Sequence, residues 1–131
     1  PRTRAPGKQA RRLIGRQTQP GFTVRMTIEA PAEAVYKFVS DPKNLRAWAS
    51  GIAKTAKVRF VEANRYGILD HYVSAEGGAE VYVPMRVFPN GEGAEVLLTI
   101  FRRPGMSEEK FGEDAQWVRR DLEALKALLE G

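Results

Sequence analysis

An alternating strand followed closely by two short helices is predicted near the N-terminus. From Phe22 to Glu29, apolar and polar residues alternate without exception, which is the pattern of a strand buried on one face. Pro31 suits the first turn of a helix because proline lacks the amide hydrogen that would be unpaired there. Asp41 can cap a second helix with Pro42 at its first position, and Gly51 can end that helix. A chain with this pattern turns sharply twice before its sheet continues.

A long amphipathic helix is predicted at the C-terminus. Pro104 and Gly105 end the preceding strand, and Ser107 is placed to cap the helix. Apolar residues then recur at spacings of three and four: Phe111, Ala115, Val118, Leu122, Leu125 and Leu129. Burying the five large ones at about 1.5–3 kcal/mol each gives roughly 8–15 kcal/mol before the entropy cost is subtracted. A helix this apolar on one face must lie against a sheet.

Four further strands are expected between these two ends. They cover approximately residues 57–62, 67–75, 80–88 and 95–102. Two of the junctions, Gly77-Gly78 and Asn90-Gly91, are strong hairpin signals because glycine and asparagine tolerate a positive φ. The chain is therefore expected to be an α+β protein with a curved antiparallel sheet and the long C-terminal helix packed on its concave face.

Composition excludes several classes of site. The chain has 131 residues, the size of one domain, with no cysteine and only one histidine, His71. Disulfides, thiolate zinc sites and histidine-pair metal sites are excluded, and we expect no metal and no cofactor. No apolar run approaches the roughly 20 residues that cross a bilayer, and the N-terminus lacks the apolar core of a secretory signal. We therefore expect a cytoplasmic protein without membrane insertion.

The net charge of +5 is concentrated in the first 20 residues. That segment holds six of the 21 basic side chains and no acidic one, which leaves 15 basic and 16 acidic residues in the remainder. The sequence predicts a basic flexible arm over residues 1–20 and a nearly neutral domain over residues 21–131. A neutral domain argues against nucleic acid as its partner. The alternative is an arm that touches an anionic polymer or lipid surface.

Several short motifs accompany this order of elements. They lie at Ala30 to Tyr36, Asp41-Pro42, Leu45 to Trp48, Leu69 to Val73, Pro84 to Val87 and Phe101 to Met106. Together with the first strand and the last helix, they resemble the START-like superfamily of helix-grip domains. That superfamily includes Bet v 1-like proteins and the SRPBCC group of polyketide cyclase/dehydrase and lipid-transport proteins. The resemblance implies a sheet that grips the last helix around an apolar cavity, but its motifs are packing and turn features that do not define a function.

The expected sheet is smaller than that of such domains. They usually have six strands after the two short helices, whereas four are expected here. The stretch from Gly51 to Lys57 is too short to hold another strand. Either the sheet is abbreviated or a segment near residues 51–57 is missing relative to the family. A smaller sheet would reduce the cavity.

A two-residue turn at Gly77-Gly78 would pair Tyr72 with Val83 and Asp70 with Met85. Asp70 and Tyr72 would then be polar side chains on the concave face, and we expect them to anchor a ligand. The other expected lining residues are Met26, Val83, Met85, Leu98, Trp117 and Val118. No catalytic residue is assigned.

The same register gives other roles to two ionisable groups. Asp70 could instead form a buried ion pair that fixes the strand register, with Arg59 on the preceding strand as its partner. His71 would point outward beside Arg86, away from any pocket, which argues against a role as general base.

The leading hypothesis is binding of a small hydrophobic or amphipathic ligand between the sheet and the C-terminal helix. The first alternative is a polyketide cyclase/aromatase-like enzyme in which Asp70 or Tyr72 moves a proton. The second is a protein-interaction module with a filled core, which a cavity below about 300 Å³ would favour. A homodimer could form through the exposed sheet edge.

Overall fold

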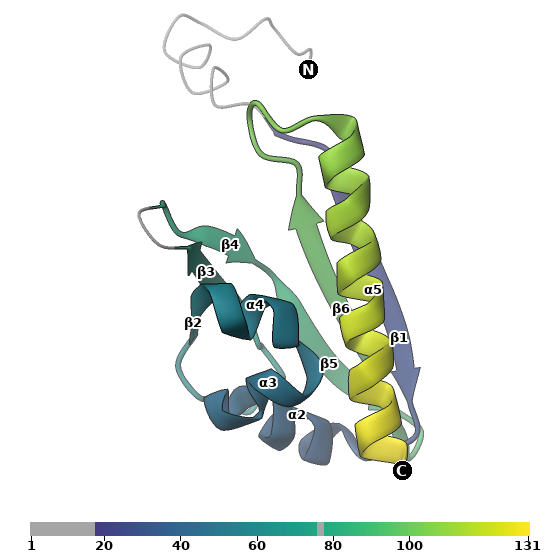
Figure 1. Ribbon diagram of the computed structural model, residues 1–131. Coiled ribbons are helices and arrows are strands. Elements are labelled where there is room, and N and C mark those ends of the chain that lie inside the picture. Colours follow the sequence, from purple (N-terminus) through teal and green to yellow (C-terminus); the bar gives the residue numbers. More distant parts are fainter. Residues whose placement is uncertain (1–17, 76–77) are drawn as a thin grey trace, which may run out of the picture.

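The computed structural model describes residues 18–75 and 78–131. Most of the predicted arm, residues 1–17, lies outside the described residues. In chain order the elements are β1 (Gly21–Ile28), α2 (Ala32–Ser40), the 3-10 turn η1 (Pro42–Asn44), α3 (Leu45–Trp48), α4 (Ser50–Thr55), β2 (Ala56–Phe60), β3 (His71–Ala75), β4 (Val81–Val83), β5 (Met85–Asn90), β6 (Gly93–Phe101) and α5 (Glu108–Glu130). Figure 1 shows the long helix α5 in front of β1 and β6, with the short helices grouped beside it.

The strands form two antiparallel sheets, in the orders β1-β6-β5 and β2-β3-β4. The predicted strand over residues 80–88 is divided at Pro84, which has no amide hydrogen to donate to a ladder. Residues 67–69 bridge the two sheets, because Leu69 donates to the Met85 carbonyl and Val87 donates to the Gly67 carbonyl, each at 2.9 Å. Gly67 has a φ of +74°, and a Cβ there would collide with the Val87 carbonyl oxygen.

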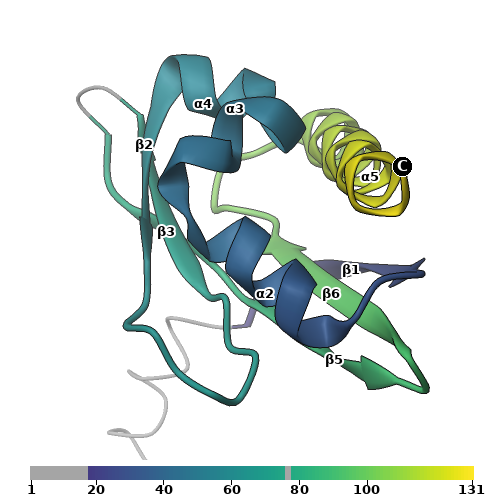
Figure 2. The same ribbon diagram turned by 90° about the horizontal axis from the view of Figure 1, so that it is seen from below.

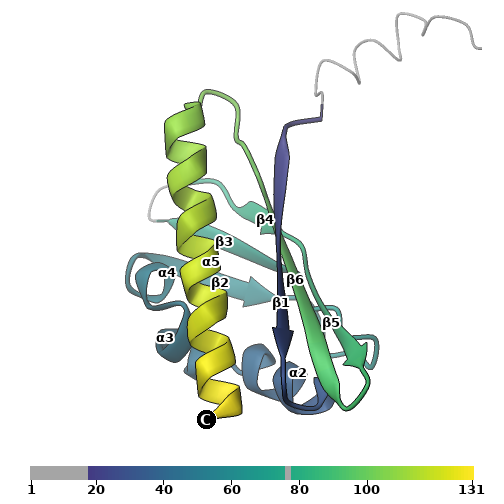
Figure 3. The ribbon, with the colours of Figure 1, turned by 90° about the vertical axis from the view of Figure 1, so that its right-hand side faces the viewer.

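The long helix closes the space that the two sheets leave between them. In Figure 2, which looks approximately along α5, the sheets run in different directions and α3 and α4 lie across the space from β6. Figure 3 shows α5 running beside β1, and the two elements are in contact. Leu122 and Leu125 of α5 are fully buried. The expected α+β fold with antiparallel sheets, short helices near the N-terminus and a long C-terminal helix is confirmed.

Of the four predicted helix boundaries, two are confirmed by their capping hydrogen bonds, and Pro31 lies directly before α2, at its N-cap position. The Asp41 side chain accepts from the amide of Lys43 at 3.0 Å, and the Ser107 hydroxyl accepts from the amide of Lys110 at 3.0 Å. The prediction that Gly51 ends a helix is wrong. The chain breaks at Ala49, whose φ and ψ of −127° and 54° are not helical, and Gly51 lies inside a further helix, α4.

The predicted pairing of β3 with β4 is also wrong. Val83 pairs with His71 and Tyr82 pairs with Tyr72, so the register differs from the prediction by one residue. Seven residues, 74–80, lie between the paired positions Val73 and Val81. A hairpin with a two-residue turn always has an even number of residues between two paired positions, so the predicted turn does not fit this pairing. A shift of one residue turns every side chain of a strand to the opposite face. His71 therefore points to the concave face, and Tyr72 points away from it.

Candidate functional site

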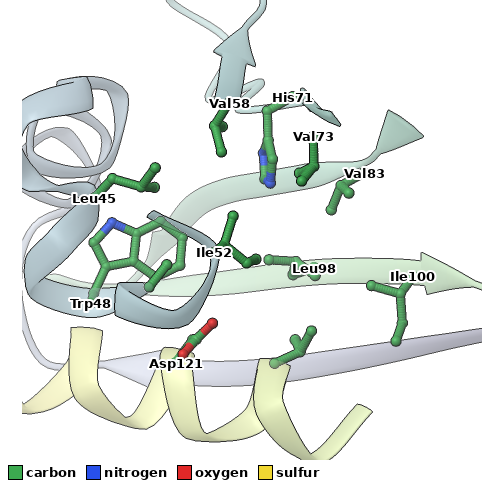
Figure 4. A pocket seen from close by; sticks show the side chains of 12 residues that line it. Leu45, Trp48, Ile52, Val58, His71, Val73, Val83, Leu98, Ile100 and Asp121 are labelled. Carbon is green, nitrogen blue, oxygen red and sulfur yellow. The ribbon is translucent and has the colours of Figure 1, made fainter. Parts of the chain in front are cut away.

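A cavity of about 50 Å³ lies between the two sheets, the short helices and α5 (Figure 4). Its wall is almost entirely apolar. Leu45, Trp48 and Ile52 come from α3 and α4, and Val118 comes from α5. Valine, leucine and isoleucine side chains of β2, β3, β4 and β6 complete the wall. Among the described residues, the only ionisable side chains that line the cavity are His71 of β3 and Asp121 of α5.

His71 has a fixed tautomer and a buried ring. Its Nδ1 lies 2.9 Å from the carbonyl oxygen of Leu69, and the whole residue is only 5% exposed. Because a carbonyl oxygen can only accept, Nδ1 must carry a hydrogen, which leaves Nε2 of the neutral ring as an acceptor. Burial lowers the pKa of His71 below its ordinary value of 6.5, partly opposed by the hydrogen bond to Leu69 and by Asp70. The imidazole is therefore neutral at pH 7.

Asp121 faces His71 from the other side of the cavity (Figure 4). It lies three residues after Val118, on the part of α5 that turns toward the sheets. Burial raises the pKa of Asp121 from 3.8 to about 6. Within residues 18–75 and 78–131, no side chain forms an ion pair or a hydrogen bond with its carboxyl group. The carboxyl group is mainly ionised at pH 7.5 and mainly protonated at pH 5.

Trp48 contributes a buried donor to the same region. The residue is 4% exposed and lines the cavity with its indole ring. Its Nε1 has no hydrogen-bond partner among the described residues. An unsatisfied buried donor costs about 1–3 kcal/mol, so the ring is held in place by its apolar contacts.

Asp70 holds the bend between β4 and β5 and does not line the cavity. Its Oδ1 accepts from the amide of Met85 at 2.9 Å and from the guanidinium of Arg86, and its Oδ2 accepts from the Tyr82 hydroxyl at 2.7 Å. The ion pair expected with Arg59 is therefore formed with Arg86 instead. These contacts fit the structural interpretation of Asp70, in which a buried ion pair fixes the register.

Tyr72 lies on the outer face, as the observed register requires. Its ring packs against that of Tyr82 at 5.4 Å between centroids, and the guanidinium of Arg59 lies 4.5 Å from its centre. Arg59 also donates to Glu80 at 2.9 Å. Tyr72 does not line the cavity as the described residues define it.

Three of the expected lining residues do line the cavity: Val83, Leu98 and Val118. Three others lie elsewhere. Met85 is fully buried outside the cavity, and Met26 is partly buried against the core. Trp117 is 53% exposed, and the guanidinium of Arg120 lies 5.0 Å from its ring centre. The apolar stripe of α5 is thus narrower than a pattern that includes Trp117.

Sequence reasoning missed the two ionisable groups of the cavity. Asp121 follows Val118 by three residues and precedes Leu125 by four, so it interrupts an apolar stripe with a charge. That spacing was a usable signal. His71 carried no such signal, because its direction depends on the register of β3.

Among residues 18–75 and 78–131, no group of three acidic or histidine side chains is arranged to hold a metal ion. The same part of the chain contains no helix that is both long and apolar enough to span a membrane.

No family model matches this chain, and neither does any curated protein sequence. Several solved structures are similar. DynU16, a protein in the dynemicin biosynthetic locus, superimposes with a TM-score of 0.68 at 16% identity over 84% of this chain and 47% of its own. This chain therefore spans about half the length of DynU16.

Two further structures show the same arrangement. MLL2253 from Mesorhizobium loti has a TM-score of 0.66 at 14% identity over 84% of this chain and 96% of its own. The di-domain ARO/CYC BexL from the BE-7585A biosynthetic pathway has a TM-score of 0.59 at 18% identity over 82% of this chain and 45% of its own. The chain has the START-like helix-grip fold that is also called the Bet v 1-like or SRPBCC fold.

Proposed function

We propose that this protein binds a small, mainly apolar molecule in the cavity between the two sheets, α3, α4 and α5. One observation carries the proposal: an apolar cavity holds two ionisable side chains, His71 and Asp121, that the interior does not pair with each other. Nδ1 of His71 is bonded to the Leu69 carbonyl, but Nε2 of His71 and the partly exposed carboxyl group of Asp121 have no hydrogen-bond partner among the described residues. A core selected only for packing rarely keeps ionisable groups with unused polar atoms beside an apolar wall. A polar group on a bound molecule would supply the missing contacts.

The cavity must widen to accept such a molecule. Its volume of about 50 Å³ has room for a few water molecules, whereas pockets for drug-sized ligands have about 300 Å³ or more. A cavity of this small volume is what an interaction module with a filled core would have. The proposal therefore requires one wall to move.

Helix α4 is the wall best suited to move. It supplies Ile52 to the cavity, yet none of its six residues is buried. The break at Ala49 separates it from α3, and no side chain caps its first turn. Few buried contacts and a free helix start correspond to low local stability. We infer that α4 swings outward and takes Ile52 with it when a ligand binds.

Nuclear magnetic resonance on the full chain can test this function with 2-phenylethanol as a neutral probe. The two tryptophans give separate indole signals: Trp48 lines the cavity and Trp117 is exposed. We expect saturable shifts at the Trp48 indole and at Ile52, with none at Trp117. Val118→Phe fills the cavity and should abolish these shifts. Equal shifts at both tryptophans, or none at either, would refute ligand binding in the cavity and favour the interaction module.

The position of His71 favours a second candidate function, proton transfer to or from a bound molecule. A neutral imidazole with a free Nε2 is suited to act as a general base. One of the similar structures, BexL, is a di-domain ARO/CYC protein of a biosynthetic pathway, which agrees with a role in chemistry on a bound molecule. The sequence predicts Asp70 or Tyr72 for this role, but neither side chain lines the cavity. If a cyclisable polyketide is the substrate, His71→Phe should abolish turnover and change affinity by less than about threefold.

A further inference from the structure

The charge of the cavity restricts the ligands that it can hold. His71 is neutral at pH 7.5, whereas most Asp121 side chains are ionised at that pH. Neither lysine nor arginine is among the residues that line the cavity. The described cavity therefore carries a net charge close to −1 and has no cation of its own to balance it.

Asp121 has no compensating neighbour on the elements around it. α5 packs against β1 and α3, and burial is the single cause of the raised pKa of Asp121. A cation close to the carboxylate would have opposed that rise. Nearby ion pairs on α5 are made elsewhere, between Lys110 and Asp114 and between Lys126 and Glu130.

We propose that the ligand is an amphipathic amine whose ammonium group pairs with Asp121 while its apolar body fills the space between the sheets and α5. An ammonium group has donors and no acceptor, which suits a wall whose ionisable groups are both acceptors at neutral pH. A carboxylate of the same shape would meet a like charge beside an apolar wall, which is unfavourable. The proposal rests on the function proposed above and names its ligand class.

Three probes with one apolar body and different head groups test this inference on the full chain: 2-phenylethylamine, 2-phenylethanol and phenylacetate. Titration at pH 7.5 should give the tightest binding for the amine and the weakest for the carboxylate. We expect a ratio of at least about tenfold between these two, which corresponds to about 1.4 kcal/mol. The affinity of the amine should fall between pH 7.5 and pH 5, because Asp121 takes up a proton over this range while the amine stays charged.

Matched variants assign the effect to one carboxyl group. Asp121→Asn should lower the affinity of the amine about tenfold and bring the three probes within about threefold of one another. Glu123→Gln removes the same charge from an exposed position of α5 and should leave the affinities of all three probes unchanged. Unchanged amine binding in Asp121→Asn would overturn the inference.

The outcomes also separate this inference from the proposed function. If the three probes bind the wild type equally well, and Val118→Phe blocks all of them, the cavity binds ligands and the amine preference is wrong. If none of the probes binds, both proposals are wrong.

Discussion

Ionisation of the Asp121 side chain opposes folding. Its pKa is about 6 in the folded protein and 3.8 ordinarily, so folding favours the protonated form. The penalty is complete above pH 6 and disappears as the pH falls toward 3.8. A shift of this size is reduced by the partial exposure of the group, which leaves a penalty of about 1–2 kcal/mol. We predict that Asp121→Asn is more stable than the wild type by this amount at pH 8.

The difference in the free energy of unfolding between the wild type and Asp121→Asn should vanish near pH 3.5, where the side chain at position 121 is neutral in both proteins. Urea denaturation at pH 3.5 and pH 8 measures it directly. The comparison also cancels the contribution of His71, whose lowered pKa makes both proteins less stable as the pH falls below 6.5. A stability difference that is the same at both pH values would contradict the partly buried position of Asp121.

Trp48 tests how much an unpaired donor matters inside an apolar wall. Trp48→Phe removes the indole nitrogen, which has no described partner, and keeps most of the apolar contacts. We predict a change in the free energy of unfolding of less than about 1.5 kcal/mol, because the lost volume and the removed donor act in opposite directions. Trp48→Ala should cost about 3–5 kcal/mol. Thermal unfolding of both variants measures the contrast, and equal losses would show that the nitrogen has a partner.

At the scale of elements, the bend between β4 and β5 depends on one carboxylate. Asp70 accepts from the Met85 amide, from Arg86 and from the Tyr82 hydroxyl. We predict that Asp70→Ala lowers stability by about 2–4 kcal/mol, because a buried amide and a half-exposed guanidinium lose their acceptor. Chemical denaturation measures this loss. Lys110→Gln breaks an exposed pair on α5 and should cost less than about 0.5 kcal/mol.

A second variant, Asp70→Asn, separates a structural role of Asp70 from the anchoring role predicted by the sequence. Asp70→Asn keeps the shape and can still accept from the Met85 amide. We expect it to bind 2-phenylethanol with unchanged affinity, since Asp70 is not among the residues that line the cavity. A large loss of affinity in a folded Asp70→Asn protein would support the role of Asp70 as a ligand anchor.

Elements that are set by local contacts could be predicted from the sequence, and those set by distant contacts could not. The caps at Asp41 and Ser107 depend on residues two or three positions away, and both are present. The register of β3 depends on the length of its connection to β4, which a pair of glycines does not fix. Because the predicted register was wrong by one residue, Tyr72 was expected to face the cavity and His71 was expected to face away from it. An irregularity in the strand at Pro84 could be predicted, because proline has no amide hydrogen to donate to a neighbouring strand.

For the molecule as a whole, the order of the elements was sufficient to predict the fold. A half-buried strand, two short helices, hairpins and a long apolar helix pack together in few ways. Of the eight residues predicted to bind a ligand, three line the cavity, namely Val83, Leu98 and Val118. Its chemistry did not follow, because Asp121 and His71 approach the cavity from elements 50 residues apart in the chain. Sequence patterns report one element at a time and do not define which polar groups share a cavity.

The distribution of charge over the whole chain gives the last prediction. Residues 1–17 contain all six basic side chains of the predicted arm and no acidic one, so their removal changes the net charge from +5 to −1. We propose that this segment, and not the folded domain, is responsible for any association with anionic polymers or membranes. Deleting it should abolish binding to RNA and to vesicles that contain phosphatidylserine. It should leave the unfolding temperature and the affinity for 2-phenylethanol unchanged.

Binding of the full chain to RNA and to anionic vesicles should also weaken steeply with salt, because each basic side chain that contacts a phosphate releases a counterion. Sedimentation with vesicles at 50 and 200 mM salt measures this for the full and shortened chains. Neutral vesicles serve as the control and should bind neither protein. If the shortened chain kept salt-insensitive binding to anionic vesicles, the attraction would arise from the domain, whose exposed aromatic residues Phe88, Phe101 and Trp117 would then be the first positions to change.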